Sequence, residues 1–130
     1  MERFLVDTSA VFALLCKDDR RHAQARKMLK SAGEKGWQPF LTNFIIAETH
    51  ALLLNRLGHE AARYWLAATK WPVEKVTEND EKRARRIIFD YSDKDFSYTD
   101  ATSFAVMERL NLSKVNTFDQ HFRQFGLDVI

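Results

Sequence analysis

The sequence predicts an α/β fold of three layers, in which helices cover both faces of a mainly parallel central sheet. Short apolar segments, typical of buried strands, alternate along the chain with longer segments that have the apolar spacing of helices. The 130 residues are 45% hydrophobic and include only four glycines and two prolines. This length and composition exclude a disordered or repetitive chain and predict a single domain over residues 1–130.

The first part of the chain is expected to form two strands and four helices. In order, these are a strand over 4–6, helices over 9–15 and 22–32, a strand over 39–42, and helices over 43–57 and 59–70. Gly33 and Gly36 are expected to close the second helix, and Gly58 the third, because glycine favours helix ends. Pro72 stops the fourth, since proline cannot continue a helix.

The second part is expected to form three strands and three helices. In order, these are a strand over 73–76, helices over 79–91 and 98–110, a strand over 114–117, a short helix over 119–125 and a strand over 127–130. Strands that alternate with helices favour a parallel sheet. In such a sheet the reaction site lies at the carboxyl ends of the strands.

Four acidic residues are expected at this end of the sheet. Asp7 directly follows the first strand, and Asp100 lies in the first turn of a helix. Asp119 comes two residues after Thr117, at the end of another strand. Glu48 lies within the third helix, where it interrupts an apolar face. The sequence therefore predicts a cluster of carboxylates at one edge of the sheet.

A cluster of this kind calls for a compensating positive charge. An ionised carboxylate in apolar surroundings is costly unless a cation or strong hydrogen-bond donors accompany it. No lysine or arginine lies at helical spacing from Glu48 or Asp100 on the same side. The chain has one cysteine, Cys16, and no group of Cys and His with zinc-ligand spacing. Oxygen ligands without such a group favour Mg²⁺ or Mn²⁺.

Each of the four acids also has a purely structural interpretation. Asp119 could cap its helix, and Asp7 could belong to an ordinary strand-to-helix turn. Asp100 could form a capping box with Ser97. Glu48 could be a solvated residue on a partly exposed helix. The functional interpretation is favoured because all four would otherwise fall at one end of one sheet by coincidence.

Four segments of the chain form an ordered set. They are Phe-Leu-Val-Asp-Thr-Ser-Ala at 4–10, Ala-Glu-Thr-His-Ala-Leu-Leu at 47–53, Asp-Phe-Ser-Tyr-Thr-Asp-Ala at 95–101 and Asn-Thr-Phe-Asp-Gln-His-Phe at 116–122. In order and spacing, over essentially the whole chain, they resemble PIN-domain proteins of the VapC-like toxin group. The resemblance implies an α/β/α fold, metal-dependent endoribonuclease activity on RNA and, in toxins, a cognate antitoxin that blocks the site.

The resemblance also implies which residues act in catalysis and metal binding. These are Asp7, Glu48, Asp100 and Asp119, with the Thr117 hydroxyl in support of the last acid. We expect Asp7 and Asp100 to bind Mg²⁺, or Mn²⁺, directly and Asp119 to bind it directly or through water. Glu48 orients a water molecule or binds a second ion, so one ion and two ions are both open. The carboxylates repel one another, so activity should require metal and fall at acid pH.

Two other functions stay open at this point. A PIN-like domain could hold RNA or a protein without cutting, or the chain could be a housekeeping RNA-maturation nuclease. His50 and His121 could be metal ligands, but a lone histidine is more often at the surface or in support of a site, and an oxygen-rich site does not need a nitrogen ligand.

Charge and the remaining apolar surface bear on partners. Setting the four acids aside from the 18 leaves 14 acidic against 20 basic residues, so the rest carries +6 rather than +2 and could attract RNA. The helix over 43–57 has a second apolar side, formed by Ile46, Leu53, Leu54 and Leu57. A homodimer, an antitoxin helix or the following helix could cover it. With no signal-peptide core and no membrane-spanning run, we expect a cytoplasmic protein.

Overall fold

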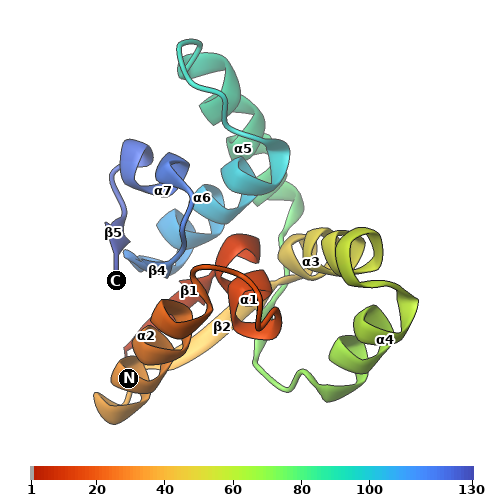
Figure 1. Cartoon of the computed structure of the whole chain (residues 1–130). Coiled ribbons are helices and arrows are strands. Elements are labelled where there is room, and N and C mark those ends of the chain that lie inside the picture. The colour runs from red at the N-terminus through yellow and green to blue at the C-terminus, as the bar shows by residue number, and fades with distance from the viewer. Residues whose placement is uncertain (1) are drawn as a thin grey trace.

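The strands form one five-stranded sheet in the computed structural model, which describes residues 2–130 (Figure 1). They are β1 (Arg3–Val6), β2 (Gln38–Thr42), β3 (Val73–Glu74), β4 (Lys114–Asn116) and β5 (Asp128–Val129). Their order in the sheet is β3-β2-β1-β4-β5, and each neighbouring pair is parallel. The predicted α/β fold with a mainly parallel sheet is confirmed.

Helices occupy most of the chain between the strands. They are α1 (Thr8–Leu15), α2 (His22–Glu34), α3 (Asn43–Leu57), α4 (His59–Ala68), α5 (Glu78–Asp90), α6 (Tyr98–Leu110) and α7 (Gln120–Phe125). Gly33 does not close α2 as predicted but lies inside it, since one glycine costs a helix only about 1 kcal/mol. The chain turns at Gly36, where φ is +76°. No helix within 2–130 is long and apolar enough to cross a membrane.

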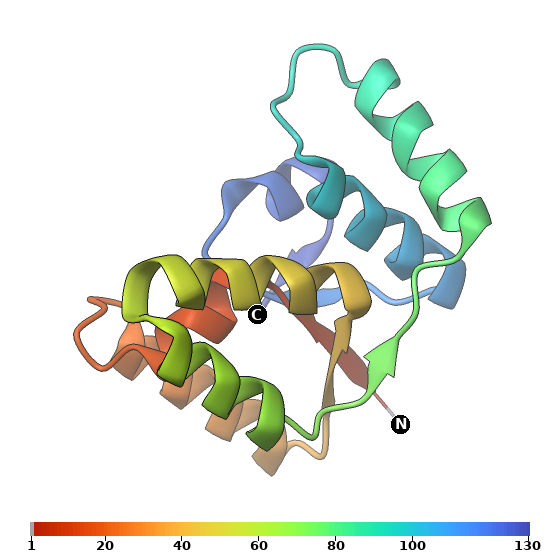
Figure 2. The same ribbon diagram turned by 90° about the vertical axis from the view of Figure 1, so that its right-hand side faces the viewer.

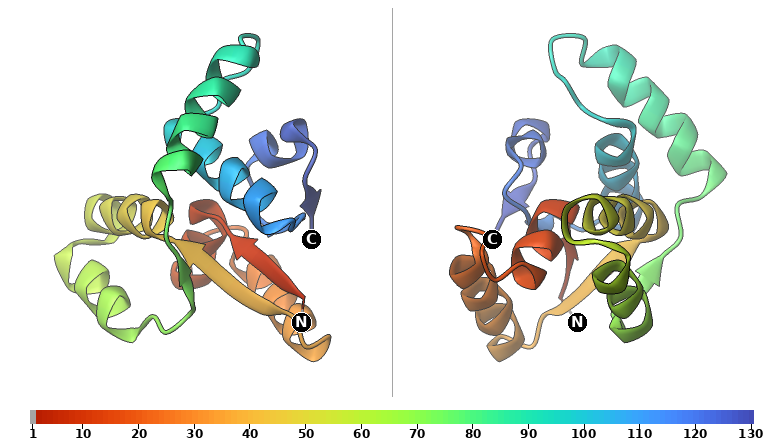
Figure 3. Two further views of the ribbon diagram at one scale, coloured as in Figure 1. Left: turned by 180° about the vertical axis from the view of Figure 1, so that it is seen from behind. Right: turned by 45° about the vertical axis from the view of Figure 1, so that its right-hand side comes forward.

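The strand order places the helices in two layers. From β1 the chain moves outward to β2 and then β3, whereas β4 and β5 lie on the other side of β1. Right-handed connections therefore put α1 to α4 on one face and α5 to α7 on the other. Packing agrees, because α1 contacts α2 and α3, and α6 contacts α5 and α7. Figures 2 and 3 show the two groups of helices on opposite sides of the strands.

The reversal of strand order falls between β1 and β4. Loops that leave two neighbouring strands toward opposite faces open a crevice at the carboxyl ends of those strands. The pairing of Val6 with Asn116 brings residues 7 and 117 side by side at this point. Asp7 and Thr117, predicted to lie at strand ends, therefore flank the crevice.

A buried core holds this edge of the sheet in place. Phe4, Leu5 and Val6 of β1 are fully buried, as expected for a central strand covered on both faces. On the second face, Phe104 of α6 packs edge-on against Phe122, with ring centres 5.1 Å apart, and stacks on Phe125 at 4.3 Å. These rings fix α7 against α6, and the starts of both helices carry predicted site residues.

Candidate active site

The four predicted acids line one cavity of about 390 Å³ at the carboxyl edge of the sheet. They reach it from the end of β1, the middle of α3 and the starts of α6 and α7. The lining comprises Asp7, Thr8, Ser9, Glu48, Leu52, Ser97, Asp100, Asp119 and His121. Volume alone does not distinguish this cavity, because a hollow of about 510 Å³ between α1 and α2 holds none of the acids. The four carboxylates distinguish the cavity at the edge of the sheet from this hollow.

Asp7 is the most constrained of these carboxylates. It is 4% exposed and caps α1. Its Oδ2 accepts hydrogen bonds from Thr117 Oγ1 at 2.9 Å and Ser9 Oγ at 3.0 Å. Burial raises the pKa of Asp7 from 3.8 to about 6, although these two hydroxyls favour the charged form. The nearby charges of Asp100 and Glu48 also raise it.

Asp100 lies in the first turn of α6 and forms a capping box with Ser97. Its backbone N–H donates to Ser97 Oγ at 3.0 Å, and its Oδ2 accepts from the Ser97 N–H at 3.1 Å. The same Oδ2 lies 2.8 Å from His121 Nδ1. Asp100 is 6% exposed, so the cap also aims a buried carboxylate into the cavity.

Asp119 caps α7 and is linked to Asp7 through one hydroxyl. Its Oδ1 accepts from the His121 N–H at 2.9 Å. Its own N–H donates to Thr117 Oγ1 at 2.9 Å, and that hydroxyl donates to Asp7. Thr117 thus connects two of the predicted acids, whereas the resemblance implied only support of the last one. The caps considered as alternatives are present, and they coexist with the cluster because each cap points its carboxylate at the same cavity.

Glu48 reaches the cavity from the middle of α3. Its side chain is half-buried, so it is neither fully solvated nor fully enclosed by the apolar face of the helix. Its charge acts on the pKa of Asp7, so it faces the other acids rather than open solvent alone. Thr49 on the next helical position donates to Thr8 Oγ1 at 3.4 Å and ties α3 to α1.

Among the lining residues that were not predicted as site residues, Ser9 and His121 contact the carboxylates with their side chains. Ser9 Oγ donates to Asp7 and accepts from the Phe118 N–H at 2.9 Å. These hydrogen bonds join the start of α1 to the loop that follows β4. His121 contacts Asp100 and also lies 3.3 Å from Asp119 Oδ1. The sequence signals for His121 were its place in the family-like segment 116–122 and its position two residues after a helix-capping acid, and neither distinguishes a ligand from a supporting residue.

The cluster has no basic partner of the usual kind. Within 2–130, no lysine or arginine forms an ion pair with any of the four acids. One carboxylate oxygen each from Asp100 and Asp119 and one ring nitrogen of His121 lie within 4.8 Å of one another. Crowded carboxylate oxygens without compensating charge fit a divalent cation. With such an ion, the arrangement could activate water and hold a phosphate.

Known proteins share both sequence and fold with this chain. The PIN domain family model matches residues 4–127. The chain is 35% identical over 124 residues to the 23S rRNA-specific endonuclease VapC20 of Mycobacterium tuberculosis, covering 93% of this chain and 92% of that protein. The crystal structure of M. tuberculosis VapC20, described as a sarcin–ricin loop cleaving toxin, matches with a TM-score of 0.89 at 30% identity over 98% of each chain.

A second solved structure shares the fold alone. It is a toxin–antitoxin complex from Klebsiella pneumoniae, with a TM-score of 0.64 and 17% identity over 90% of this chain and 87% of that chain. The family match spans nearly all of the described chain, and the VapC20 match covers it at an identity well above that of chains that share only a fold. The resemblance carried by the four segments is confirmed, and the chain belongs to the PIN domain family.

Proposed function

We propose that this chain is a metal-dependent endoribonuclease and the toxin of a toxin–antitoxin pair. The observation that carries the proposal is the group of four carboxylates, uncompensated by lysine or arginine, in one cavity at the point where the strand order reverses. Membership of the PIN domain family and the similarity to a ribosomal RNA endonuclease support it. A complete set of acids favours an enzyme over a binding module that does not cut.

Asp7, Asp100 and Asp119 would hold Mg²⁺ or Mn²⁺. When bound, the cation lowers the pKa of a water ligand and neutralises charge on the phosphate and the departing oxygen. Thr117 holds Asp7 in position through a hydrogen bond of 2.9 Å, and the capping box holds Asp100. Glu48, which lines the same cavity, would act as the hydrogen-bond acceptor that orients a water molecule for attack.

The substrate we propose is RNA, with large-subunit ribosomal RNA as the first class to test. VapC20 acts on 23S rRNA and cleaves the sarcin–ricin loop, and this chain aligns with nearly all of it. The guanidinium of Arg21 lies 5.2 Å from the centre of the Phe118 ring, next to Thr117 in the chain. This position lets Arg21 bind a backbone phosphate beside the acids. Action on ribosomal RNA would place the protein in the cytoplasm.

We further propose a cognate antitoxin and a homodimer as partners. The toxin–antitoxin complex of the same fold supports the first. For the second, α4 covers only part of α3, because Leu53 is buried while Leu54 and Leu57 are 47% and 43% exposed. Light scattering on Leu54→Glu and on the unchanged protein tests the dimer, which should dissociate in the variant.

The decisive experiment measures RNA cleavage by the purified chain and by Asp7→Asn. We expect Mg²⁺ or Mn²⁺ to support cleavage, EDTA to stop it and Asp7→Asn to abolish it. Asp18→Asn, an exposed change outside the cavity, is the matched control and should cleave normally. Sequencing of the RNA ends gives the cut position. Undiminished cleavage by a repurified Asp7→Asn protein would overturn the assignment.

A further inference from the structure

We propose that His121 is a metal ligand of this site and that its Nδ1 atom makes the site prefer Mn²⁺ to Mg²⁺. The inference deepens the proposed function, since it concerns the same cation. It differs from the expectation from the sequence, in which Asp7, Asp100 and Asp119 bind the ion and no nitrogen ligand is needed. It also explains why a histidine, rather than an apolar or hydroxyl side chain, lies between the buried Asp100 and the half-buried Asp119.

The first support is the spacing of the donor atoms. Nδ1 of His121 lies 2.8 Å from Asp100 Oδ2 and 3.3 Å from Asp119 Oδ1. Neighbouring ligands of an octahedral ion with bonds of about 2.1 Å are themselves about 3 Å apart. The two measured separations bracket that value. Small movements of these side chains would therefore place all three atoms around one ion.

The second support is the rigidity of the three ligands. The ring of His121 packs edge-on against Phe96, with ring centres 5.6 Å apart at 74°. Its backbone N–H is bound by Asp119 Oδ1, and Asp100 is fixed by its cap. The His121 side chain is 21% exposed, so the ring is held while its edge stays open to the cavity. A donor that is held in place loses little conformational freedom when it binds.

The chemistry of nitrogen then sets the preference. Mg²⁺ strongly favours oxygen ligands and keeps its water, whereas imidazole binds transition metals well. One nitrogen among carboxylates shifts an oxygen site toward Mn²⁺ without making it the nitrogen- and sulfur-rich site typical of zinc. The competing role for Nδ1 is a hydrogen bond donated to Asp100. The two roles exclude each other, because a ligand nitrogen needs its lone pair free.

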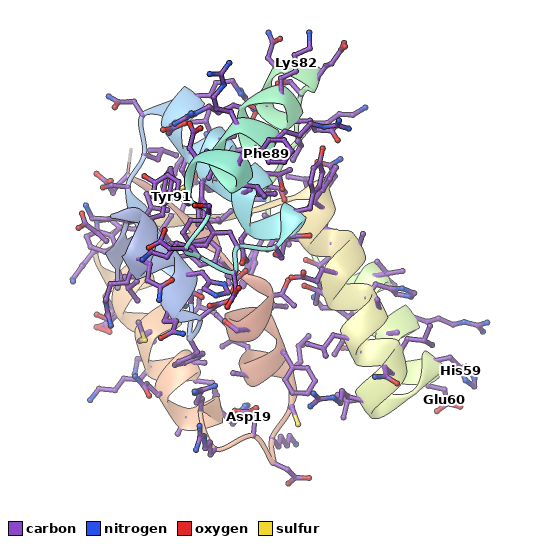
Figure 4. The ribbon with its side chains drawn as sticks, turned by 90° about the horizontal axis from the view of Figure 1, so that it is seen from above. Asp19, His59, Glu60, Lys82, Phe89 and Tyr91 are labelled. Carbon is purple, nitrogen blue, oxygen red and sulfur yellow. The ribbon has the colours of Figure 1, made fainter. Side chains whose placement is uncertain are left out.

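Pulsed electron paramagnetic resonance on Mn²⁺ bound to the RNA-free protein tests the proposal directly. A coordinated imidazole gives a ¹⁴N coupling to Mn²⁺, and a histidine that only hydrogen-bonds to a carboxylate does not. We expect the coupling in the unchanged protein and in His59→Gln, and its loss in His121→Gln. His59 is the matched control, since it lies exposed at the start of α4, at the edge of the molecule in Figure 4.

Titrations with Mn²⁺ and Mg²⁺ give the second measurement. In His121→Gln we expect Mn²⁺ affinity to fall roughly tenfold and Mg²⁺ affinity to change less than about twofold. His121→Asp supplies an oxygen instead, so it should bind both ions, show no ¹⁴N coupling and lose the preference. Circular dichroism checks that each variant is folded, and the spectrum of the unchanged protein needs no variant.

Three results would overturn the inference, and the first two concern the nitrogen ligand alone. One is Mn²⁺ bound to the unchanged protein without a ¹⁴N coupling, and the other is an equal loss of Mn²⁺ and Mg²⁺ affinity in His121→Gln. Absence of any metal binding would overturn it too, together with the proposed metal dependence. A ¹⁴N coupling in a protein that cleaves no RNA would leave the ligand assignment standing and contradict only the proposed nuclease.

Discussion

Two helices of this protein begin with the same motif and use it for opposite purposes. Thr77 and Asp80 form a capping box at the start of α5, and Ser97 and Asp100 form one at the start of α6. Both aspartates are buried, at 3% and 6% exposure. The local sequence, hydrogen bonds and burial are thus nearly alike. What differs is the charge that faces each carboxylate.

At α5 the protein supplies its own cation. Arg109 donates to both carboxylate oxygens of Asp80, at 3.0 Å from Nε and 3.0 Å from Nη2. Burial alone would raise the pKa of Asp80, but the hydrogen bonds from Arg109 and Thr77 hold it below its usual value. Arg109 also reaches Glu74 at 3.4 Å. This acidic group is neutralised within the fold and contributes to stability.

At α6, no arginine or lysine among residues 2–130 forms an ion pair with the group. Asp100 faces Asp7, Asp119 and the ring of His121, and burial raises the pKa of Asp7 to about 6. A carboxylate that burial penalises and no basic residue compensates makes the folded state less stable, and ligand binding can recover that free energy. The two helices therefore share the capping box and differ in one partner. Arg109 pairs with the capping-box aspartate of α5, and no arginine or lysine in the described part of the chain pairs with that of α6.

The largest expected effect is on RNA cleavage, and it distinguishes the capping box of α6 from that of α5. Asp100→Asn should reduce metal-dependent cleavage by at least about 100-fold, because it removes a charge that the cation needs while the amide oxygen still accepts from Ser97. Asp80→Asn should cleave normally per folded molecule. Single-turnover cleavage rates, corrected for folded protein by circular dichroism, check this. Equal losses in the two variants would contradict the division between a stabilising cap and a functional one.

The second prediction is that a substitution in the site raises the free energy of unfolding, whereas most substitutions lower it. The pKa of Asp7 is about 6 in the folded protein and 3.8 ordinarily, so the folded state favours the protonated carboxyl. This favourable contribution to the free energy of unfolding is complete below about pH 4 and is lost as the pH rises through 6. At pH 7.5 without metal, Asp7→Asn should therefore raise the free energy of unfolding by up to about 3 kcal/mol. Urea unfolding in EDTA at pH 7.5 and pH 4 measures it. The gain should vanish at pH 4, and a less stable variant at pH 7.5 would contradict the account.

The third prediction is the opposite change at the paired cap. Asp80→Asn should lower the free energy of unfolding at pH 7.5 by about 2 kcal/mol, since it breaks a charged hydrogen-bonded pair whose arginine stays partly solvated. The pKa of Asp80 is lowered, so its contribution is present above about pH 4 and is lost as pH falls below that value. Urea unfolding across this range gives the measurement. A variant that matches the unchanged protein at pH 7.5 would show that Arg109 adds nothing.

The fold and the acids could be predicted from the sequence because their signals are local. Asp7 follows an apolar run directly, and Ser97 lies three residues before Asp100, so strand ends and caps were recognisable from neighbouring residues. The partner of a cap is not local. Arg109 lies 29 residues beyond Asp80, and His121 lies 21 beyond Asp100. The sequence showed the caps alike and could not tell which one the fold would neutralise.

His121 shows the same limit from the other side. Its neighbours in sequence indicated a helix start and a family-like segment, and a lone histidine there is more often at the surface or in support of a site than a ligand. Its place between two acids depends on how α7 packs on α6 through Phe104 and Phe122, which is a property of the assembled core. The four acids were predicted because their positions along the elements, their shared end of the sheet and the family resemblance agreed. No such agreement singled out the histidine.

The smallest expected effect tests the hydroxyl that links the acids. Thr117 donates to Asp7 and accepts from the Asp119 N–H, so Thr117→Val keeps the shape and removes both hydrogen bonds. We expect cleavage to fall roughly tenfold, as for other groups that orient a ligand without touching the ion, with Thr117→Ser restoring most of it. Cleavage rates measured over a range of Mn²⁺ concentrations check this. Because the carboxylates remain, excess Mn²⁺ should recover part of the lost rate, and a loss as large as that of Asp100→Asn would make Thr117 a ligand itself.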